Sequence, residues 1–139
     1  LDYMNLIGHW EFGIGKKSFV YEKGQFEILL NLDDLNIDYW LQQWIFTYKW
    51  ISEIISKRIN SKNYNIKLVC YEDLCIRYSY KESLFKKLSI KKNAHDFNFY
   101  LGKSNFNNDS IIFNRGLIEE ANIIYEKLRN KSYEDLNTD

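Results

Sequence analysis

The residue types best suited to acid–base chemistry gather near the start of the chain. His9 and Glu11 lie two residues apart in the sequence Gly8-His9-Trp10-Glu11-Phe12-Gly13. A histidine beside a carboxylate can take up and return a proton near neutral pH, which is the basis of general acid–base catalysis. The same pattern also fits a loop histidine that packs on Trp10 and takes no part in chemistry. We name His9 and Glu11 as candidate catalytic residues and keep both interpretations.

A second pair of acidic side chains follows a short apolar segment in the middle of the chain. Residues 65–71 are mostly apolar and partly β-branched, which predicts a buried strand at about 66–71. Glu72 and Asp73 come directly after it, at the place where strands of α/β proteins commonly present functional groups. Alternatively, the two carboxylates cap the following turn and pair with a nearby base.

The patterns that hold phosphate or metal are incomplete in this sequence. Gly102-Lys103-Ser104 and Gly15-Lys16-Lys17-Ser18 both lack the earlier glycine of a phosphate-binding loop, because Phe97 and Trp10 stand at those positions. The only two cysteines are Cys70 and Cys75, and two thiols cannot complete a four-ligand zinc site. The sequence therefore predicts no bound metal and two reduced, structural thiols.

Helical periodicity dominates the elements that would position these residues. Apolar side chains recur at steps of three and four residues from Leu35 to Ile55, which predicts a long, Trp-rich helix at 36–59. The same argument predicts helices at 80–89 and at 115–130, the last with Asn114 as its N-cap.

Two other regions lack this periodicity. Residues 1–32 are interrupted by glycines, and we expect loops there with a short strand at 26–30. Residues 93–113 are rich in asparagine and aromatic residues, and we expect irregular structure. With one clear strand at 66–71, the predicted fold class is α/β but predominantly helical.

Composition limits the classes of protein that this chain can represent. Its 139 residues are 45% hydrophobic and 17% aromatic, which is enough to build the core of a single domain over 1–139. The 19 basic and 19 acidic residues balance, so neither nucleic acid nor an anionic membrane is favoured as a partner. No segment approaches the roughly 20 apolar residues of a membrane span, and residues 1–10 do not resemble a secretion signal. We expect a cytoplasmic domain, and the first residue, Leu1, suggests a fragment of a larger protein.

Taken in order, these segments resemble the C-terminal half of a sulfotransferase that uses 3′-phosphoadenosine 5′-phosphosulfate. The similarity covers residues 5–130 and depends on the order of elements more than on any one motif. Its parts are the Trp-rich helix (40–55), the strand (65–70), the Tyr71-Glu72-Asp73-Leu74-Cys75 box, a short helix (84–88) and the final helix (117–128). The resemblance implies a partial P-loop-type fold and transfer of a sulfuryl group to a hydroxyl or amine of a small-molecule or glycan acceptor.

The resemblance also implies roles for individual residues. Phe113-Asn114-Arg115-Gly116 is similar to a late basic–glycine segment that contacts the 3′-phosphate of the donor, so Arg115 is the candidate donor-binding residue. His9 or Glu11 would line the acceptor pocket. The Lys-Ser/Thr loop that holds the 5′-phosphosulfate in family members has no counterpart here and would lie upstream of Leu1.

A second interpretation belongs to another class of protein. The chain has three predicted helices with apolar faces, a neutral net charge and no phosphate loop. These features also predict a mostly helical, non-catalytic protein-interaction module. For either interpretation, we expect that homo-oligomers could form through the apolar helix faces.

Overall fold

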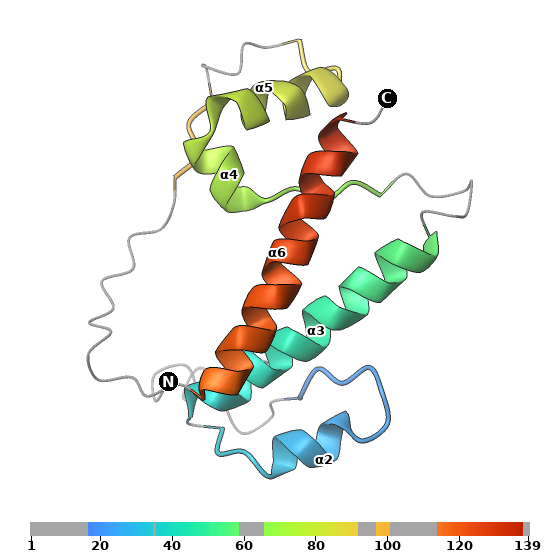
Figure 1. The fold of residues 1–139 in the computed structure, drawn as a ribbon, viewed down its shortest axis with the longest axis vertical. Helices are drawn as coiled ribbons and strands as arrows, with labels where there is room; N and C mark the ends of the chain where they lie inside the picture. Colours follow the sequence, from blue (N-terminus) through green and yellow to red (C-terminus); the bar gives the residue numbers. More distant parts are fainter. Residues whose placement is uncertain (1–16, 35, 59–65, 92–96, 101–113, 138–139) are drawn as a thin grey trace. The chain divides into compact units, whose positions relative to one another are not determined.

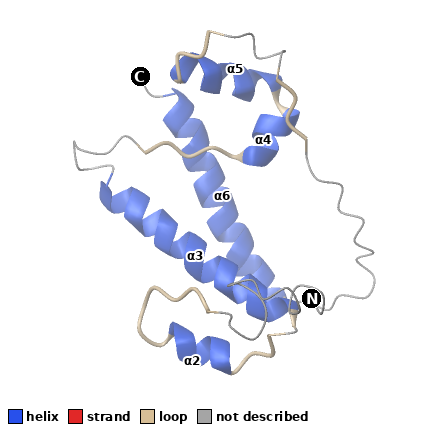
Figure 2. Ribbon diagram, turned by 180° about the vertical axis from the view of Figure 1, so that it is seen from behind, coloured by secondary structure: helices blue, strands red, loops and turns tan. Residues whose placement is uncertain are grey.

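The structure is a computed structural model of the chain, and it describes residues 17–34, 36–58, 66–91, 97–100 and 114–137. Within these ranges the chain is mostly helical and contains no β-strand (Figures 1 and 2). The residues divide into two compact units, and α6 (Arg115–Asn137) contributes to both of them. The first unit contains α2 (Gln25–Leu30), α3 (Ile37–Arg58) and α6 up to Tyr125. The second unit contains α4 (Tyr71–Ile76), α5 (Tyr78–Lys87) and α6 from Glu126 onward.

The long helix predicted at 36–59 is confirmed as α3. Its start is fixed locally, because the Asn36 side chain accepts a hydrogen bond of 3.0 Å from the Asp38 amide. The buried side chains of Tyr39 and Phe46 form a core with Leu29 of α2. Trp40 packs against this core and donates its indole N–H to the Asp34 carbonyl at 3.1 Å. The Trp-rich stripe of the sequence therefore serves mainly as a packing surface.

The strand predicted at 26–30 is wrong, since this segment forms the short helix α2. Gly24 precedes it with a φ of 92°, a left-handed conformation that turns the chain. The Gln25 side chain then accepts hydrogen bonds from the amides of Tyr21 and Glu22, at 2.7 and 3.2 Å. A short apolar run is compatible with strand or helix by periodicity alone, and here the turn at Gly24 and the burial of Leu29 favour helix.

The strand predicted at 66–71 is also wrong, and with it the α/β fold class. Residues 66–70 have no regular secondary structure, Cys70 is extended, and Tyr71 begins α4; the described part of the chain holds no strand beside this segment. Instead of joining a ladder, the amide of Leu68 donates to Asp135 Oδ2 at 3.1 Å and that of Cys70 donates to Tyr80 Oη at 2.8 Å. Side chains therefore satisfy the groups that a sheet would have paired. The described residues contain no sheet on which a partial P-loop-type fold could be built, whereas the predicted predominance of helix is confirmed.

The two remaining predicted helices are confirmed with different ends. The helix predicted at 80–89 is α5, which starts two residues earlier. The helix predicted at 115–130 is α6, and Asn114 caps it by accepting the amides of Gly116 and Leu117 at 3.0 and 3.4 Å. The helix continues to Asn137, beyond the predicted end at 130. Apolar periodicity did not predict this extension, because the buried side of the last two turns includes polar residues. These residues are Ser132 and Asp135.

The loop predicted at 93–113 can be compared only in part. Residues 97–100 have no regular secondary structure, and the rest of that segment lies outside the described residues. Of the helices that the structure describes, none is both long and apolar enough to cross a lipid bilayer.

Candidate functional site

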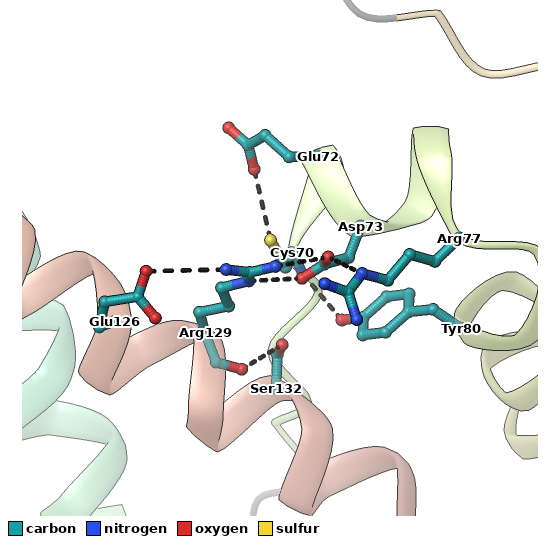
Figure 3. Close-up of polar contacts among 8 residues, drawn as sticks. All are labelled: Cys70, Glu72, Asp73, Arg77, Tyr80, Glu126, Arg129 and Ser132. Carbon is teal, nitrogen blue, oxygen red and sulfur yellow. Dashed lines mark hydrogen bonds and ion pairs between the residues drawn. The ribbon is translucent and has the colours of Figure 1, made fainter.

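The most concentrated group of charges in the second unit surrounds the fully buried side chain of Asp73 (Figure 3). Arg129 of α6 approaches this carboxylate with two nitrogens, at 2.7 Å from Nε to Oδ2 and 2.9 Å from Nη2 to Oδ1. Arg77, which directly follows the last residue of α4, places its Nε 2.9 Å from Oδ1. One carboxylate is thus held between two guanidinium groups, one from α6 and one from the residue that joins α4 to α5.

The local sequence explains how α4 presents this carboxylate. Cys70 is extended and precedes the helix, so Asp73 falls in the first turn of α4, where the helix dipole favours a negative charge. Arg77 follows four residues later, just past the end of α4, and its amide donates to the Asp73 carbonyl at 2.8 Å, which keeps the two residues close together. The second arginine comes from the distant helix α6, whose Ser132 side chain donates a 2.7 Å hydrogen bond to the Arg129 carbonyl.

Aromatic side chains surround the ion pair. The rings of Tyr80 and Tyr133 meet edge to face, with centroids 5.1 Å apart, and the Arg77 guanidinium lies 5.9 Å from the centre of the Tyr133 ring. Burial and then the charge of Asp73 raise the pKa of the Tyr133 hydroxyl. Glu126, one turn before Arg129 on α6, lies 3.6 Å from Arg129 and adds a second negative charge at the edge of the cluster (Figure 3).

The electrostatics of this cluster favour a structural role for Asp73. Hydrogen bonds from Arg129 are the main cause that lowers the pKa of Asp73 to about 2, against the opposing effect of burial. The carboxylate is therefore ionised at neutral pH, and both of its oxygens are occupied by guanidinium nitrogens. A group with so low a pKa is a weak proton acceptor at neutral pH. The arrangement attaches α4 to α6, in agreement with the alternative that the acidic residues pair with a nearby base.

The cysteines and the second acidic residue lie at the edge of the same site. Neither cysteine forms a disulfide bond. The Cys70 thiol is buried and donates to Glu72 Oε2 at 3.4 Å, while a hydrogen bond with Cys75 is the main cause that raises the pKa of Tyr71. Glu72 itself is exposed. These contacts account for the acidic and thiol side chains of α4 within the fold.

Of the candidate residues named from the sequence, the structure describes Arg115. His9 and Glu11 lie outside the described residues. Arg115 begins α6 as expected, but its side chain is 92% exposed and its Nε pairs with Glu119 at 3.0 Å. The amides next to it already donate to Asn114, so the cap of this helix end comes from the chain itself.

Sequence reasoning missed the arginines that complete the Asp73 site. Arg77 and Arg129 have no motif around them, and the helix that presents Arg129 was expected to end at 130. One signal was available, because the chain has only four arginines beside fifteen lysines. Arginine is the residue that pairs best with a buried carboxylate, since its planar group donates two parallel hydrogen bonds.

The described residues also contain no group of three or more histidine, cysteine, aspartate or glutamate side chains placed to hold a metal ion. Comparisons with protein-family models, with curated proteins and with solved structures find no match to this chain. The assignment of a function therefore depends on the contacts and exposed surfaces of the chain itself.

Proposed function

We propose that this chain is a helical protein-interaction module that binds a partner protein through the apolar side chains of α2. The observation that carries the proposal is the distribution of residue types on this helix. Its buried positions are Gln25 and Leu29, whereas Phe26 and Leu30 are 49% and 67% exposed. Large apolar side chains on a short surface helix stabilise a complex when a partner removes them from water, by about 25 cal/mol for each Å² covered.

The buried Gln25 explains how such a helix stays in place. Its side-chain oxygen accepts the amides of Tyr21 and Glu22, so the position is filled by a satisfied polar group and not by an apolar one. Leu29 alone inserts fully into the core with Tyr39 and Phe46. The helix is therefore attached by polar contacts and one leucine, which leaves its larger apolar side chains available to a partner.

The segment before α2 adds further exposed apolar surface on an ordered backbone. Phe19 and Val20 are both exposed, and the Phe19 amide donates to Gln43 of α3 at 2.8 Å. Trp50 of α3 is also 41% exposed and stacks on Tyr21, with ring centres 4.6 Å apart. Aromatic side chains held in fixed positions are typical of protein interfaces, because little conformational freedom is lost on binding.

Site-specific photo-crosslinking tests this proposal. A photoreactive residue at position 30 is expected to capture a partner from the source cell, and the same group at the exposed position 57 of α3 is the control. The captured partner is then purified, and its affinity for the chain is measured by calorimetry. Phe26→Glu and Leu30→Glu should weaken that affinity at least about tenfold, as expected for central interface residues.

The variant Glu27→Lys is the matched control, since it changes a charge on the same helix without removing an apolar group. Circular dichroism should show that all three variants keep the helical content of the wild type. Equal capture from positions 30 and 57, or equal loss of affinity in the Glu27 variant, would count against α2 as the binding surface.

Sulfuryl transfer remains a prediction for this chain, with less support than the interaction module. Its motif residues Glu72 and Asp73 follow a segment without regular secondary structure and not a strand, and their contacts are explained by the packing of α4. Titration with 3′-phosphoadenosine 5′-phosphate distinguishes the two functions. Micromolar binding that Arg115→Ala abolishes would favour the enzyme, whereas the interaction module predicts no binding.

A further inference from the structure

One polar atom inside the Asp73 site makes no hydrogen bond. The hydroxyl oxygen of Tyr133 is buried, and no group among the residues that the structure describes lies in hydrogen-bonding position to it. A buried hydroxyl without a partner lowers stability, because it has lost its contact with water and gained nothing in exchange. The packing of α6 alone gives no reason to keep a hydroxyl at this position.

This hydroxyl lies beside the carboxylate of Asp73. Tyr133 follows Arg129 by four residues on α6, so the two side chains share the face of the helix that meets Asp73. The guanidinium of Arg77, which also contacts Asp73, is 5.9 Å from the centre of the Tyr133 ring. Burial and then the interaction with Asp73 raise the pKa of the Tyr133 hydroxyl, as expected of a hydroxyl next to an ionised carboxylate. Tyr133 is thus a buried donor close to an acceptor that other donors occupy.

The two arginines hold Asp73 unequally. They approach its carboxylate from opposite sides (Figure 3). Arg129 donates from two nitrogens, at 2.7 and 2.9 Å, and its side chain is 25% exposed. Arg77 approaches through Nε, at 2.9 Å, and its side chain is 53% exposed. A contact through one nitrogen of a half-exposed side chain is weaker than a bidentate contact, so Arg77 leaves the carboxylate more readily than Arg129 does.

The oxygen Oδ1 of Asp73 is the atom that the two arginines share. Nη2 of Arg129 and Nε of Arg77 both lie 2.9 Å from it. A carboxylate oxygen has about two lone-pair positions, so Oδ1 is filled while both arginines are present. Departure of Arg77 opens one of these positions and also removes the guanidinium that lies over the Tyr133 ring.

We propose that Tyr133 is the reserve hydrogen-bond donor of Asp73, and that Arg77 and Tyr133 alternate on Oδ1. In one state Arg77 occupies Oδ1 and the Tyr133 hydroxyl has no partner. In the other state Arg77 extends into solvent and the Tyr133 hydroxyl donates to Oδ1, while Arg129 keeps both of its hydrogen bonds. The site is therefore a two-state device that releases a guanidinium at the junction of α4 and α5 without leaving Asp73 short of a donor. It is separate from the partner-binding surface proposed on α2.

A double-mutant cycle tests this exchange. Its readout is the protection factor of the Leu74 amide in hydrogen exchange, because this amide donates to the Cys70 carbonyl at 3.0 Å within α4. Arg77→Met removes the guanidinium but keeps an unbranched side chain. In the wild-type background it should lower the protection factor by less than about threefold, because Tyr133 replaces Arg77. In the Tyr133→Phe background the same change should lower it by about tenfold or more, since no donor then fills Oδ1.

Tyr71→Phe provides the matched control background. It removes a tyrosine hydroxyl from the same unit, one that donates to the Tyr100 carbonyl at 3.0 Å. Arg77→Met should have the same effect in this background as in the wild type, and circular dichroism should show unchanged helical content in every variant. Equal losses of protection in the wild-type and Tyr133→Phe backgrounds would overturn the proposal, because the hydroxyl then does not replace Arg77.

Side-chain hydrogen exchange gives a second measurement that needs only the wild type and one variant. In the wild-type chain the Nε–H of Arg77 should exchange at least about tenfold faster than that of Arg129, because only Arg77 leaves the carboxylate. In Arg77→Met the hydroxyl proton of Tyr133 should exchange several-fold more slowly than in the wild type, because it is then hydrogen-bonded to Asp73. Exchange at Arg77 as slow as at Arg129, or no slowing at the Tyr133 hydroxyl, would also contradict the alternation.

Discussion

Two hydrogen bonds of 2.7 and 2.9 Å join the carboxylate of Asp73 to the guanidinium of Arg129, 56 residues further along the chain. This is the strongest contact between α4 and the end of α6, because both partners are charged and the geometry is bidentate. Arg77 adds a second guanidinium to the same carboxylate. The predictions below concern this pair, the N-terminal cap of α6 and two glycines.

Removing the buried carboxylate should destabilise the second unit strongly. Asp73→Ala removes the buried carboxylate that pairs with Arg129 and Arg77, and breaking one side of a buried ion pair typically costs about 3–5 kcal/mol of unfolding free energy. Urea denaturation followed by circular dichroism measures the change. Arg115→Ala is the control, because that side chain is 92% exposed and its ion pair should contribute less than about 1 kcal/mol. Similar small losses in both variants would show that the Asp73 pair is not a major source of stability.

The same carboxylate should make unfolding sensitive to acid. The pKa of Asp73 is about 2 in the folded chain and 3.8 in the unfolded reference, so the unfolded state takes up its proton first as pH falls. The stability that this shift contributes, about 2 kcal/mol, is fully present above about pH 5 and is lost as pH falls through 2.

Urea midpoints measured between pH 2 and pH 6 test this dependence. Asp73→Asn cannot ionise and should remove part of the slope below pH 4. An identical slope in wild type and variant would assign the acid sensitivity to other carboxylates.

The start of α6 should depend on one side chain. Asn114→Ala removes the acceptor for the amides of Gly116 and Leu117 and should cost about 1 kcal/mol of stability. Asn122→Ala, on an exposed position in the middle of the same helix, should be neutral or slightly stabilising, because alanine has the higher helix propensity. Thermal melts of the two variants should therefore shift in opposite directions or differ by several degrees. Equal shifts would mean that the cap is not important for α6.

Two glycines should respond in opposite ways to the same substitution. Gly24 has a φ of 92° before α2, so Gly24→Ala should cost about 1 kcal/mol or more, although no atom lies within 4 Å of the added carbon. Gly116 lies in the first turn of α6, where an added carbon meets only Asn114 Oδ1 at 3.4 Å. Gly116→Ala should stabilise the helix by up to about 1 kcal/mol, because alanine is the better helix former. Chemical denaturation of both variants checks the difference in sign.

The sequence alone predicted the parts of this protein that depend on local pattern. The periodic spacing of apolar residues located α3 within one residue at each end, and Asn114 was identified as the cap of α6. When apolar residues recur every three or four positions over about twenty residues, the pattern indicates a helix even though no single position does so by itself. The alternative interpretation of Asp73, pairing with a nearby base, was also available from its place after an apolar segment.

Only the tertiary structure decided the conformation of the short segments and the membership of the site. Residues 26–30 and 66–70 have similar apolar compositions, yet the first segment is a helix and the second has no regular secondary structure. The conformation of each segment depends on side chains that accept main-chain amides. Gln25 accepts the amide of Tyr21 just before the first segment, whereas Asp135 and Tyr80 accept amides of the second. Arg129 reaches Asp73 from 56 residues away, a separation that no local pattern encodes. Periodicity records which side of an element is apolar, whereas the choice of a polar partner is made only when distant helices pack together.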